Sequence, residues 1–525
     1  MPKVVLISLK MSLDLSLALT KICDCFTLSN TIILVFLSFL LLLYNLQQRK
    51  IKKGKGYKNI PGPGQHFLGG LANLWTMRNP KAVIKVLEGL CAKYPIFRAN
   101  LISHEIVFLN SPEYVQKLYG SKDPNHGAKG FAYNTLKPLV RDGLLLSTGE
   151  KWKTRRKVLN KHMFSFKTLQ SYMKIVNSES DTLVKSLGEC ATAGSEMGKP
   201  LNEIVEASVL NIVTQITLGK NATDFKKFEE TDLTFAEMIN GAKNLISKKV
   251  LEPWWQVDQI WRFNSLSKLE KEISEFSAKH VMNSLVNDVN TDGLGIKKDL
   301  LAEGISLEGI AEEVLTMIGG GYETTVTALQ IFFFLLALHP HHQELCRQEA
   351  DSIFENEDLC TSQGHLEYGA LSKLKYLEMC MNEAFRLLPT AFFSMRCIEA
   401  PIKLDEDIEL PSGTQVAVFT PGIHKNPKFF PEPEKFKPER FSPEEIKNRS
   451  PFAFLPFSTG PRNCIGSKLA TMEILSFTAR ILRNYEIYTT DRLEDVVFLP
   501  NLTLTPEKPL NFIIRRRAAD PYQNI

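Results

Sequence analysis

The sequence lacks the features that would divide a chain of 525 residues into smaller units. After residue 64 there is no interior linker rich in glycine, serine or proline, and there is neither an internal repeat nor a low-complexity tract. Length alone would suggest about three domains. Because nothing in the composition marks an interior boundary, we expect one large domain at residues 65–525 behind a short N-terminal appendage.

Strong charge and ordered cysteine spacing are also missing. The net charge is only +5, so the sequence gives no case for a nucleic-acid-binding protein. The nine cysteines are an odd number scattered along the chain, and their spacing is not that of a zinc site. We therefore expect neither a disulfide framework nor structural zinc, and a reducing compartment suits these thiols.

One long hydrophobic run is present, near the N-terminus. Residues 28–46 carry no charged side chain, and at about 1.5 Å per residue they span about 28 Å, close to the thickness of a bilayer core. Basic residues cluster at 49–58, and such clusters stay cytoplasmic. We predict a single-pass transmembrane anchor with the following domain in the cytosol. A cleaved signal peptide is the alternative, and residues 1–27 have no assigned role.

A stiff hinge is expected between this anchor and the body. Residues 47–64 are basic and end in the run Pro61-Gly62-Pro63-Gly64. The prolines fix φ, while the glycines permit a sharp turn. This segment should hold the body at the membrane surface.

The body is expected to be mainly helical. Candidate helices lie at 80–94, 149–160, 166–188, 201–218, 231–248, 264–289, 306–338, 341–355, 374–387 and 467–482. Short strands are expected at 106–109, 415–419 and 510–514, and a proline-rich, irregular stretch covers about 388–463. This pattern predicts a mainly α (α+β) fold with a long central helix and a small β-rich region.

One cysteine near the C-terminus has an unusual setting. Cys464 lies between Gly460 and Gly466, two residues after Arg462. A lone cysteine is more often a small buried hydrophobe. Here the glycines allow backbone to approach a flat partner, N–H groups at the next helix start can face the sulfur, and the arginine can pair with an acidic group. The pattern predicts a thiolate ligand to a haem.

The residues around this cysteine resemble the haem-thiolate signature of the cytochrome P-450 superfamily. The matching positions are Phe457, Gly460, Arg462, Cys464 and Gly466. The resemblance extends from residue 61 to about residue 512. It implies haem b (iron protoporphyrin IX) with Cys464 as axial ligand. With the anchor and hinge, it resembles the microsomal type on the cytosolic face of the endoplasmic reticulum membrane.

The predicted helix 306–338 has glycines in its middle, at 319–321. Each costs about 1 kcal/mol relative to alanine, so the run indicates close packing, a kink or room beside a flat cofactor. A threonine at 324 can bond to the carbonyl four residues back. Gly320, Gly321, Glu323 and Thr324 resemble the family's oxygen-activation motif. The resemblance implies that Glu323 and Thr324 deliver protons to the distal oxygen, so that O–O cleavage outruns peroxide loss.

A possible ion network involves Glu383, Arg386 and Arg440. A Glu/Arg pair three residues apart is usually a solvated surface pair. Together, however, these residues resemble the family's buried structural trio. The resemblance implies that the trio locks the coil that carries the cysteine.

Donors to the haem propionates are implied by the same resemblance. They are Trp152, Arg156, Arg396 and Arg462. Each arginine alone would more often be a surface cation. Arg155 could take the place of Arg156 if the helix register differed by one residue.

Local details resemble the clan of fatty-acid omega-hydroxylases and many insect enzymes, including the runs 149–152 and 253–255. One position departs from that pattern. Typical omega-hydroxylases carry a glutamate at the position of Gly320, and this glutamate can become esterified to the haem. Since this chain has glycine there, we expect a non-covalent haem.

The segments expected to contact substrate are rich in apolar and aromatic residues: 127–146, 315–322, 389–393 and 501–504. They predict a lipophilic substrate, such as a fatty acid, hormone, pheromone or xenobiotic. The resemblance implies a monooxygenase that inserts one atom of O₂. Its electrons would come from NADPH through a separate NADPH–cytochrome P-450 reductase that docks on the Cys464 side. Cytochrome b5 is a further candidate partner.

Two other readings stay open at this point. One is a haem-thiolate isomerase or dehydratase that needs no O₂, against which the Glu323–Thr324 pair argues. The other is a non-enzymatic haem-binding sensor.

Overall fold

The structure is a computed structural model. It describes residues 55–63, 79–100, 104–192, 199–222, 265–287 and 295–517, with single positions at 73 and 76 and several between 237 and 249. The predicted anchor 28–46, the N-terminal extension and most of the predicted helix 231–248 lie outside the described residues. So does the first part of the hinge.

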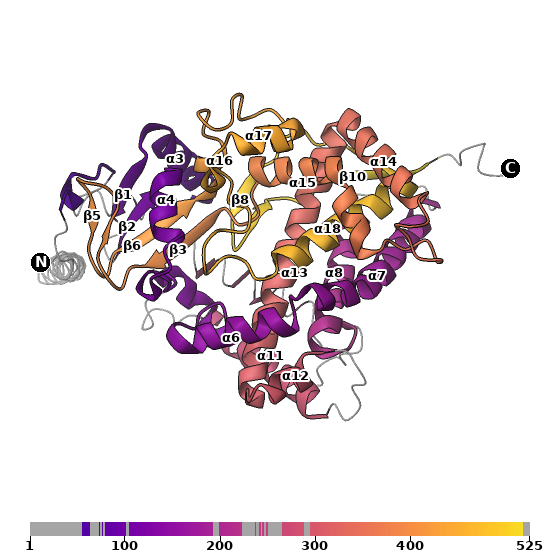
Figure 1. Ribbon diagram of the computed structural model, residues 1–525, viewed down its shortest axis with the longest axis horizontal. Helices are drawn as coiled ribbons and strands as arrows, with labels where there is room; N and C mark the ends of the chain where they lie inside the picture. Colours follow the sequence, from indigo (N-terminus) through magenta and orange to yellow (C-terminus); the bar gives the residue numbers. More distant parts are fainter. Residues whose placement is uncertain are drawn as a thin grey trace, which may run out of the picture.

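A long central helix, α13 (Leu307–Leu338), organises the helical half of the molecule (Figure 1). The hydroxyl of Ser306 accepts the N–H of Gly309 at its start, and Pro340 follows its end. Its apolar side chains pack on all sides, which is typical of a core helix. Neighbouring helices are α8 (Lys199–Leu218), α11 (Ser265–Asn287), α14 (Pro340–Phe354), α15 (Lys375–Leu387) and α18 (Ser467–Asn484).

The remaining helices complete the body. They are α3 (Pro80–Lys93), α4 (Pro112–Tyr119), α5 (Lys137–Val140), α6 (Gly149–His162), α7 (Phe166–Thr192), α12 (Lys297–Ala302), α16 (Thr420–His424) and α17 (Pro443–Lys447). The long predicted helices within the described residues are confirmed to within a few residues. The helices of eight residues or fewer were not predicted, because they contain too few turns for a periodic pattern.

A four-stranded sheet lies at the opposite end from the helical half (Figure 1). Its order is β1 (Ile96–Asn100), β2 (Glu105–Leu109), β6 (Gln415–Phe419) and β3 (Phe393–Cys397). Strands β2 and β6 run parallel, with Ile106 opposite Gln415, and the other pairs are antiparallel. The sheet therefore joins the first part of the chain to the segment before the cysteine loop.

Two-stranded ladders complete the β-structure. They are β4 (Ile402–Lys403) with β5 (Glu409–Leu410), β7 (Tyr485–Thr489) with β10 (Phe512–Arg516), and β8 (Phe498–Pro500) with β9 (Leu504–Pro506). The predicted strands at 106–109 and 415–419 are confirmed, and the one predicted at 510–514 begins two residues later.

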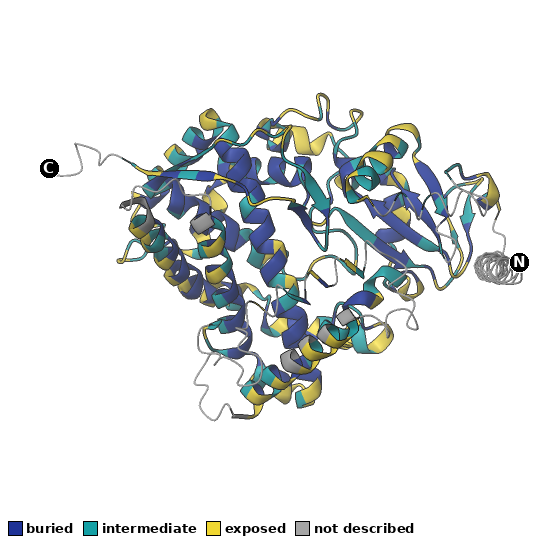
Figure 2. Ribbon diagram, turned by 180° about the vertical axis from the view of Figure 1, so that it is seen from behind, coloured by how far each residue is buried: buried dark blue, intermediate teal, exposed yellow. Residues whose placement is uncertain are grey.

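The largest hydrophobic core surrounds α13. Phe332, Phe333 and Phe334 are fully buried, and buried residues run through the centre of the helical half (Figure 2). Among the described residues, α13 alone is long and apolar enough to cross a membrane, but 78% of its most apolar window is buried inside the protein. It is therefore a core helix, and the packing around it fixes where its polar positions point.

Candidate active site

The cysteine loop turns tightly before α18. Gly460 has a φ of 75°, and a Cβ there would overlap the carbonyl oxygen of Tyr119. The N–H of Cys464 donates to the carbonyl of Phe457 at 2.9 Å. Glycine is thus needed at position 460 because the backbone there is left-handed and because the last residue of α4 lies against it. This reason differs from the predicted approach of a flat partner. Gly466 sits at the start of α18, where a Cβ would lie 4.0 Å from the sulfur.

The Cys464 thiol lies among positive charges. Desolvation raises the pKa of this thiol, while the N–H of Gly466 and the charges of Arg156 and Lys129 lower it. In the polypeptide alone the desolvation dominates, so the helix start by itself does not produce a thiolate. A metal ion at the sulfur would supply the missing stabilisation, because coordination deprotonates a thiol.

Two of the predicted arginines fasten the cysteine loop to its surroundings. Arg156, on α6, donates from Nη1 to the carbonyl of Asn463 at 2.8 Å and from Nη2 to Oδ1 of the same residue at 2.7 Å. Arg462 donates to the carbonyl of Ser147 at 2.7 Å. Its guanidinium lies 4.7 Å from the ring centroid of Trp152. The tryptophan therefore supports Arg462 by a cation–π contact.

A third arginine comes from the sheet. Arg396, on β3, is 2% exposed, and its Nη1 is buried without a hydrogen-bond partner among the described residues. Its guanidinium lies 5.0 Å from the ring centroid of Tyr119. A buried donor left without a partner costs free energy, so this nitrogen indicates a ligand with acceptor oxygens.

Lys129 joins these arginines and was not predicted. Its backbone forms a β-bridge with Arg396, and its Nζ lies 4.7 Å from the ring centroid of Tyr133. No sequence motif identifies Lys129. It is, however, the one charged residue in the run 127–136, and this could have indicated a functional role. Its position beside Arg396 adds a fourth cation to the group.

Two of these cations, Lys129 and Arg462, have a lowered pKa because of burial and neighbouring positive charge. Burial, Arg396 and Arg156 lower the pKa of Arg462 to about 9. Burial together with Arg396, Arg462 and Arg156 holds the pKa of Lys129 well below its usual range. Among the described residues, none of Lys129, Arg156, Arg396 and Arg462 forms an ion pair with a carboxylate. A dianion would relieve this repulsion, and the two propionates of a haem fit the donor set.

Two residues of the oxygen-activation motif, Gly320 and Thr324, lie on the same face of α13. Between Gly309 and Leu338, only Gly320 and Thr324 are classed as exposed, and they lie one turn apart on the same face. The Thr324 hydroxyl donates to the Gly320 carbonyl at 2.6 Å. A Cβ at Gly320 would meet nothing within 4 Å. The face is therefore shaped to leave room beside a bulky group.

Glu323 points to another side of the same helix. It is 4% exposed, and its Oε1 accepts the hydroxyl of Thr503 at 2.8 Å and that of Thr327 at 3.4 Å. The acid and Thr324 are adjacent in sequence, yet one is buried and the other is exposed. A proton passing between them would have to cross the helix surface.

The predicted ion trio is assembled below the cysteine loop. Arg386 Nε donates to Glu383 Oε2 at 2.7 Å, and neither side chain is exposed. Arg440 Nε lies 3.4 Å from Glu383 Oε1, an ion pair without hydrogen-bond geometry. Arg386 also donates to the carbonyls of His424 and Lys435, at 3.2 Å each. It thereby ties α15 to the coil that leads to Cys464.

Arg155 makes different contacts from Arg156. Its Nη1 donates to the carbonyl of Gly309 at 3.0 Å and lies 3.7 Å from Oε1 of the fully buried Glu313. Burial raises the pKa of Glu313 to about 7 despite this arginine. Glu313 also accepts the N–H of Leu144 at 3.0 Å. The predicted register of α6 places Arg156, and not Arg155, toward the cysteine loop.

An apolar wall is built from segments predicted to contact substrate. It consists of Tyr133, Leu136, Leu139, Val140, Leu145, Leu146 and Leu502. The segments 127–146 and 501–504 therefore meet. The segment 389–393 joins them, since the N–H of Leu504 donates to the carbonyl of Thr390 at 3.0 Å.

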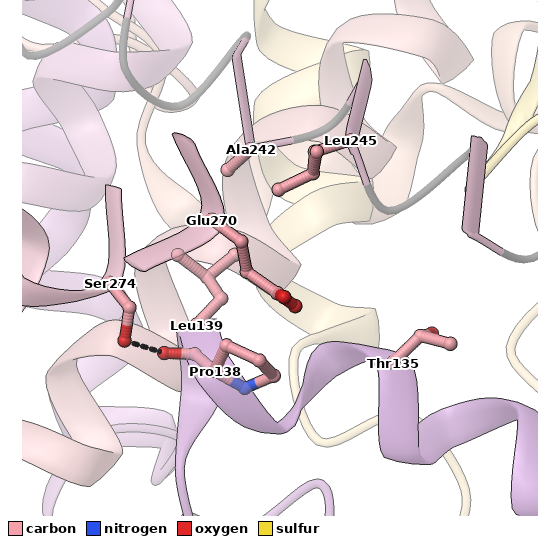
Figure 3. A pocket seen from close by; sticks show the side chains of 7 residues that line it. All are labelled: Thr135, Pro138, Leu139, Ala242, Leu245, Glu270 and Ser274. Atoms are coloured by element: carbon pink, nitrogen blue, oxygen red, sulfur yellow. Dashed lines mark hydrogen bonds between the residues drawn. The ribbon is translucent and has the colours of Figure 1, made fainter. Parts of the chain in front are cut away.

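A small pocket lies beside this wall, between α5 and α11 (Figure 3). Its cavity volume is about 20 Å³, and it is lined by Thr135, Pro138, Leu139, Ala242, Leu245, Glu270 and Ser274. The hydroxyl of Ser274 donates to the carbonyl of Pro138 at 2.6 Å and holds the two helices together. None of these residues is among the predicted haem or oxygen residues. Thr135, Pro138 and Leu139 do lie in the segment 127–146 that was predicted to contact substrate.

Comparisons with known proteins agree with this geometry. The pattern that defines the cytochrome P450 family matches residues 61–514. Cytochrome P450 4c3 of Drosophila melanogaster is 30% identical over 92% of this chain and 95% of its own length. Probable cytochrome P450 4ac3 of the same species is 31% identical, covering 76% of this chain and 80% of the relative. Cytochrome P450 4d1 of Drosophila melanogaster is 26% identical, covering 91% of this chain and 96% of the relative.

These matches confirm the resemblance to the superfamily and to its insect members. They cover the cysteine loop, the central helix and the sheet together, so they do not depend on one motif. Members of this family carry haem with a cysteine thiolate ligand, and the cations and the exposed cysteine fit that group. The chain belongs to the cytochrome P450 family and is a haem-thiolate monooxygenase.

Proposed function

We propose that this monooxygenase inserts one atom of O₂ into a lipophilic substrate, with electrons from NADPH through a separate reductase. The observation that carries the proposal is the neighbourhood of Cys464: an exposed thiol beside four cations that have no carboxylate partner among the described residues. The apolar wall nearby suits a substrate such as a fatty acid, hormone, pheromone or xenobiotic.

Haem b would be held by Cys464 at the iron and would supply the activation of O₂ when bound. Lys129, Arg156, Arg396 and Arg462 would hold the propionates, with Trp152 supporting Arg462. The trio of Glu383, Arg386 and Arg440 would keep the cysteine coil in place. The buried Nη1 of Arg396 is the donor with the strongest requirement for such a partner.

Protons would be handled by two residues of α13. Thr324 presents its hydroxyl on the exposed face, where the oxygen can accept a hydrogen bond while its single proton is donated to the Gly320 carbonyl. To donate a proton toward that face, the hydroxyl would rotate away from the Gly320 carbonyl. Glu323 would relay protons from the buried interior toward that face. General acid catalysis by positioned groups of this kind typically contributes a factor of about 10² to 10⁴.

The location and electron source complete the proposal. Residues 28–46 would anchor the protein in the endoplasmic reticulum membrane, with the catalytic domain on the cytosolic face. NADPH–cytochrome P-450 reductase would dock on the Cys464 side, and cytochrome b5 could serve as a second donor. An isomerase or sensor role is disfavoured by membership of a monooxygenase family.

The deciding experiment is the absorption spectrum of the reduced protein with carbon monoxide. Thiolate ligation gives a strongly red-shifted band, and we expect wild type to have it and Cys464→Ser to lose it. Cys360→Ser is the matched control, because Cys360 is half-buried and its Sγ lies 3.6 Å from the carbonyl of Ile353, away from the cations. A wild-type spectrum typical of nitrogen ligation would refute the assignment.

The substrate class is tested by spin-state titration with a panel of lipophilic compounds. Compounds that displace a water ligand shift the spectrum, and long-chain apolar compounds should do so at lower concentrations than polar ones. NADPH consumption with a reconstituted reductase separates the monooxygenase from the isomerase and sensor roles. Failure of every apolar compound to shift the spectrum would contradict the proposed substrate class.

A further inference from the structure

The turn between β8 and β9 inserts a hydroxyl into the core of the helical half. Thr503 is 2% exposed, and its Oγ1 donates to Glu323 Oε1 at 2.8 Å. The same hydroxyl lies 3.2 Å from Oγ1 of Thr327, whose own distance to the carboxylate is 3.4 Å. Of the two threonines, Thr503 therefore makes the shorter bond to the acid.

The neighbours of Thr503 in the turn contact the apolar wall. Leu502 packs against the cluster formed by Leu136 and Val140. On the other side, the N–H of Leu504 donates to the carbonyl of Thr390, just after α15. The turn is thus fixed at three points: the wall, the acid of α13 and the segment that follows α15.

We infer that Thr503 is a positioning residue for Glu323, and that the turn couples the fit of the substrate against Leu502 to proton supply. This inference rests on the proposed function, in which Glu323 handles protons. A buried carboxylate is held by the donors that reach it. The β-branched side chain of threonine has few rotamers, so its hydroxyl can move only when the turn moves. A shift of Leu502 would therefore change the bond to Glu323.

The coupling has a definite chemical consequence. In productive turnover, O₂, two electrons from NADPH and two protons give one oxygen atom in the substrate and one molecule of water. When the protons do not reach the oxygen atom that must leave as water, the O–O bond stays intact and O₂ is released with the same two electrons and two protons as hydrogen peroxide. A poorly positioned Glu323 should therefore divert electrons from product to peroxide. The consumption of NADPH need not fall.

The test compares Thr503→Val with Thr503→Ser in the reconstituted full-length enzyme. The valine keeps the shape and removes the hydroxyl, whereas serine keeps the donor. With the compound that gives the largest spin-state shift, the ratio of peroxide to product should rise about tenfold in the valine variant, the factor for a loss of about 1.4 kcal/mol. The serine variant should stay close to wild type, and the solvent isotope effect on product formation should increase only in the valine variant.

A control within the same β8–β9 hairpin separates local disruption from loss of the contact. Thr505 accepts a hydrogen bond from the side chain of Asn501 at 2.7 Å, whereas the hydroxyl of Thr503 is the one that donates to Glu323. Thr505→Val should therefore leave the ratio unchanged. Peroxide and product are both counted per haem that binds carbon monoxide, so partial loss of folded protein does not affect the comparison. A tenfold rise in Thr505→Val as well would overturn the inference.

Two further variants complete the design. If Leu502 acts through Thr503, Leu502→Ala should raise the peroxide ratio, and the double variant with Thr503→Val should be no worse than Thr503→Val alone. Glu323→Gln tests the proposed function itself. Uncoupling in Glu323→Gln but not in Thr503→Val overturns the positioning role alone. Wild-type coupling in Glu323→Gln overturns the proton role of Glu323, and the inference with it.

Discussion

Arg386 and Glu383 form a bidentate ion pair in the interior of the protein, with Nε to Oε2 at 2.7 Å and Nη2 to Oε1 at 2.8 Å. Glu383 also accepts the N–H of Lys437 at 2.8 Å, so one carboxylate holds both α15 and the coil beyond β6. Pairs at this spacing on a helix surface contribute little. Full burial reverses that expectation, because neither charge can return to water.

We predict that Arg386→Met destabilises the protein by about 3–5 kcal/mol, since it leaves a buried carboxylate without its cationic partner. The variant should also retain less haem after gel filtration. Lys403→Met is the matched control, because Lys403 and Glu406 have the same spacing but are 57% and 90% exposed. Its unfolding free energy should change by less than about 1 kcal/mol. Equal losses in the two variants would contradict the structural role.

The cysteine loop supplies a second prediction, at Gly460. The positive φ of 75° costs an alanine about 1–2 kcal/mol, and the added Cβ would overlap the Tyr119 carbonyl. Gly460→Ala should therefore lose most of the thiolate band in the carbon monoxide spectrum. Gly413→Ala is the comparison, because Gly413 has a φ of 85° but a Cβ there meets nothing within 4 Å. If both variants bind haem equally, the overlap is not important.

How much of this site could be predicted depends on the distance between its parts in the chain. The cysteine loop and the glycine run of α13 are local patterns, so Cys464, Gly320 and Thr324 could be found from the sequence. Lys129 and Thr503 belong to no local pattern. Thr503 meets Glu323 across 180 residues of chain, and this contact depends on how the β8–β9 turn packs against α13.

For some predicted residues the structure gives a physical setting different from the one expected from the sequence. The sequence indicated that Gly460 makes room for a flat partner, whereas the structure places it against α4 in a left-handed conformation. It also paired Glu323 with Thr324 as the acid and alcohol that the family resemblance implies. The burial around α13 separates them instead, because residues in neighbouring positions of a helix face different directions.

A third prediction concerns pH and the buried Glu313. Burial raises the pKa of this carboxyl to about 7 in the folded protein, from an ordinary value near 4.5. Its contribution to stability is therefore full below about pH 4.5, declines as the pH rises, and is lost above about pH 7. The total loss corresponds to about 3 kcal/mol.

Glu313→Gln should remove this pH dependence while keeping an acceptor for the N–H of Leu144. The unfolding free energies of the variant and wild type are measured in urea at pH 5 and pH 8. Relative to wild type, the variant should be more stable at pH 8 than at pH 5. Glu432→Gln is the control, because Lys435 and Lys437 lower the pKa of Glu432 to about 2, outside this interval. A Glu313→Gln difference that is the same at both pH values would refute the assignment.

The fourth prediction follows from Gly320, where the omega-hydroxylases that this chain resembles carry a glutamate. That glutamate can be esterified to the haem, whereas Gly320 offers no carboxylate. Acid–acetone should therefore extract all the haem from the wild-type protein after turnover. Because a Cβ at Gly320 would meet nothing within 4 Å, the backbone can accept a side chain here, and Gly320→Glu is the matched comparison. It should retain part of its haem in the protein fraction. At Gly321 a Cβ would lie 3.2 Å from Val213, so the same substitution there should disturb packing without retaining haem. Haem that stays with the wild-type protein would mean that another side chain forms the covalent bond.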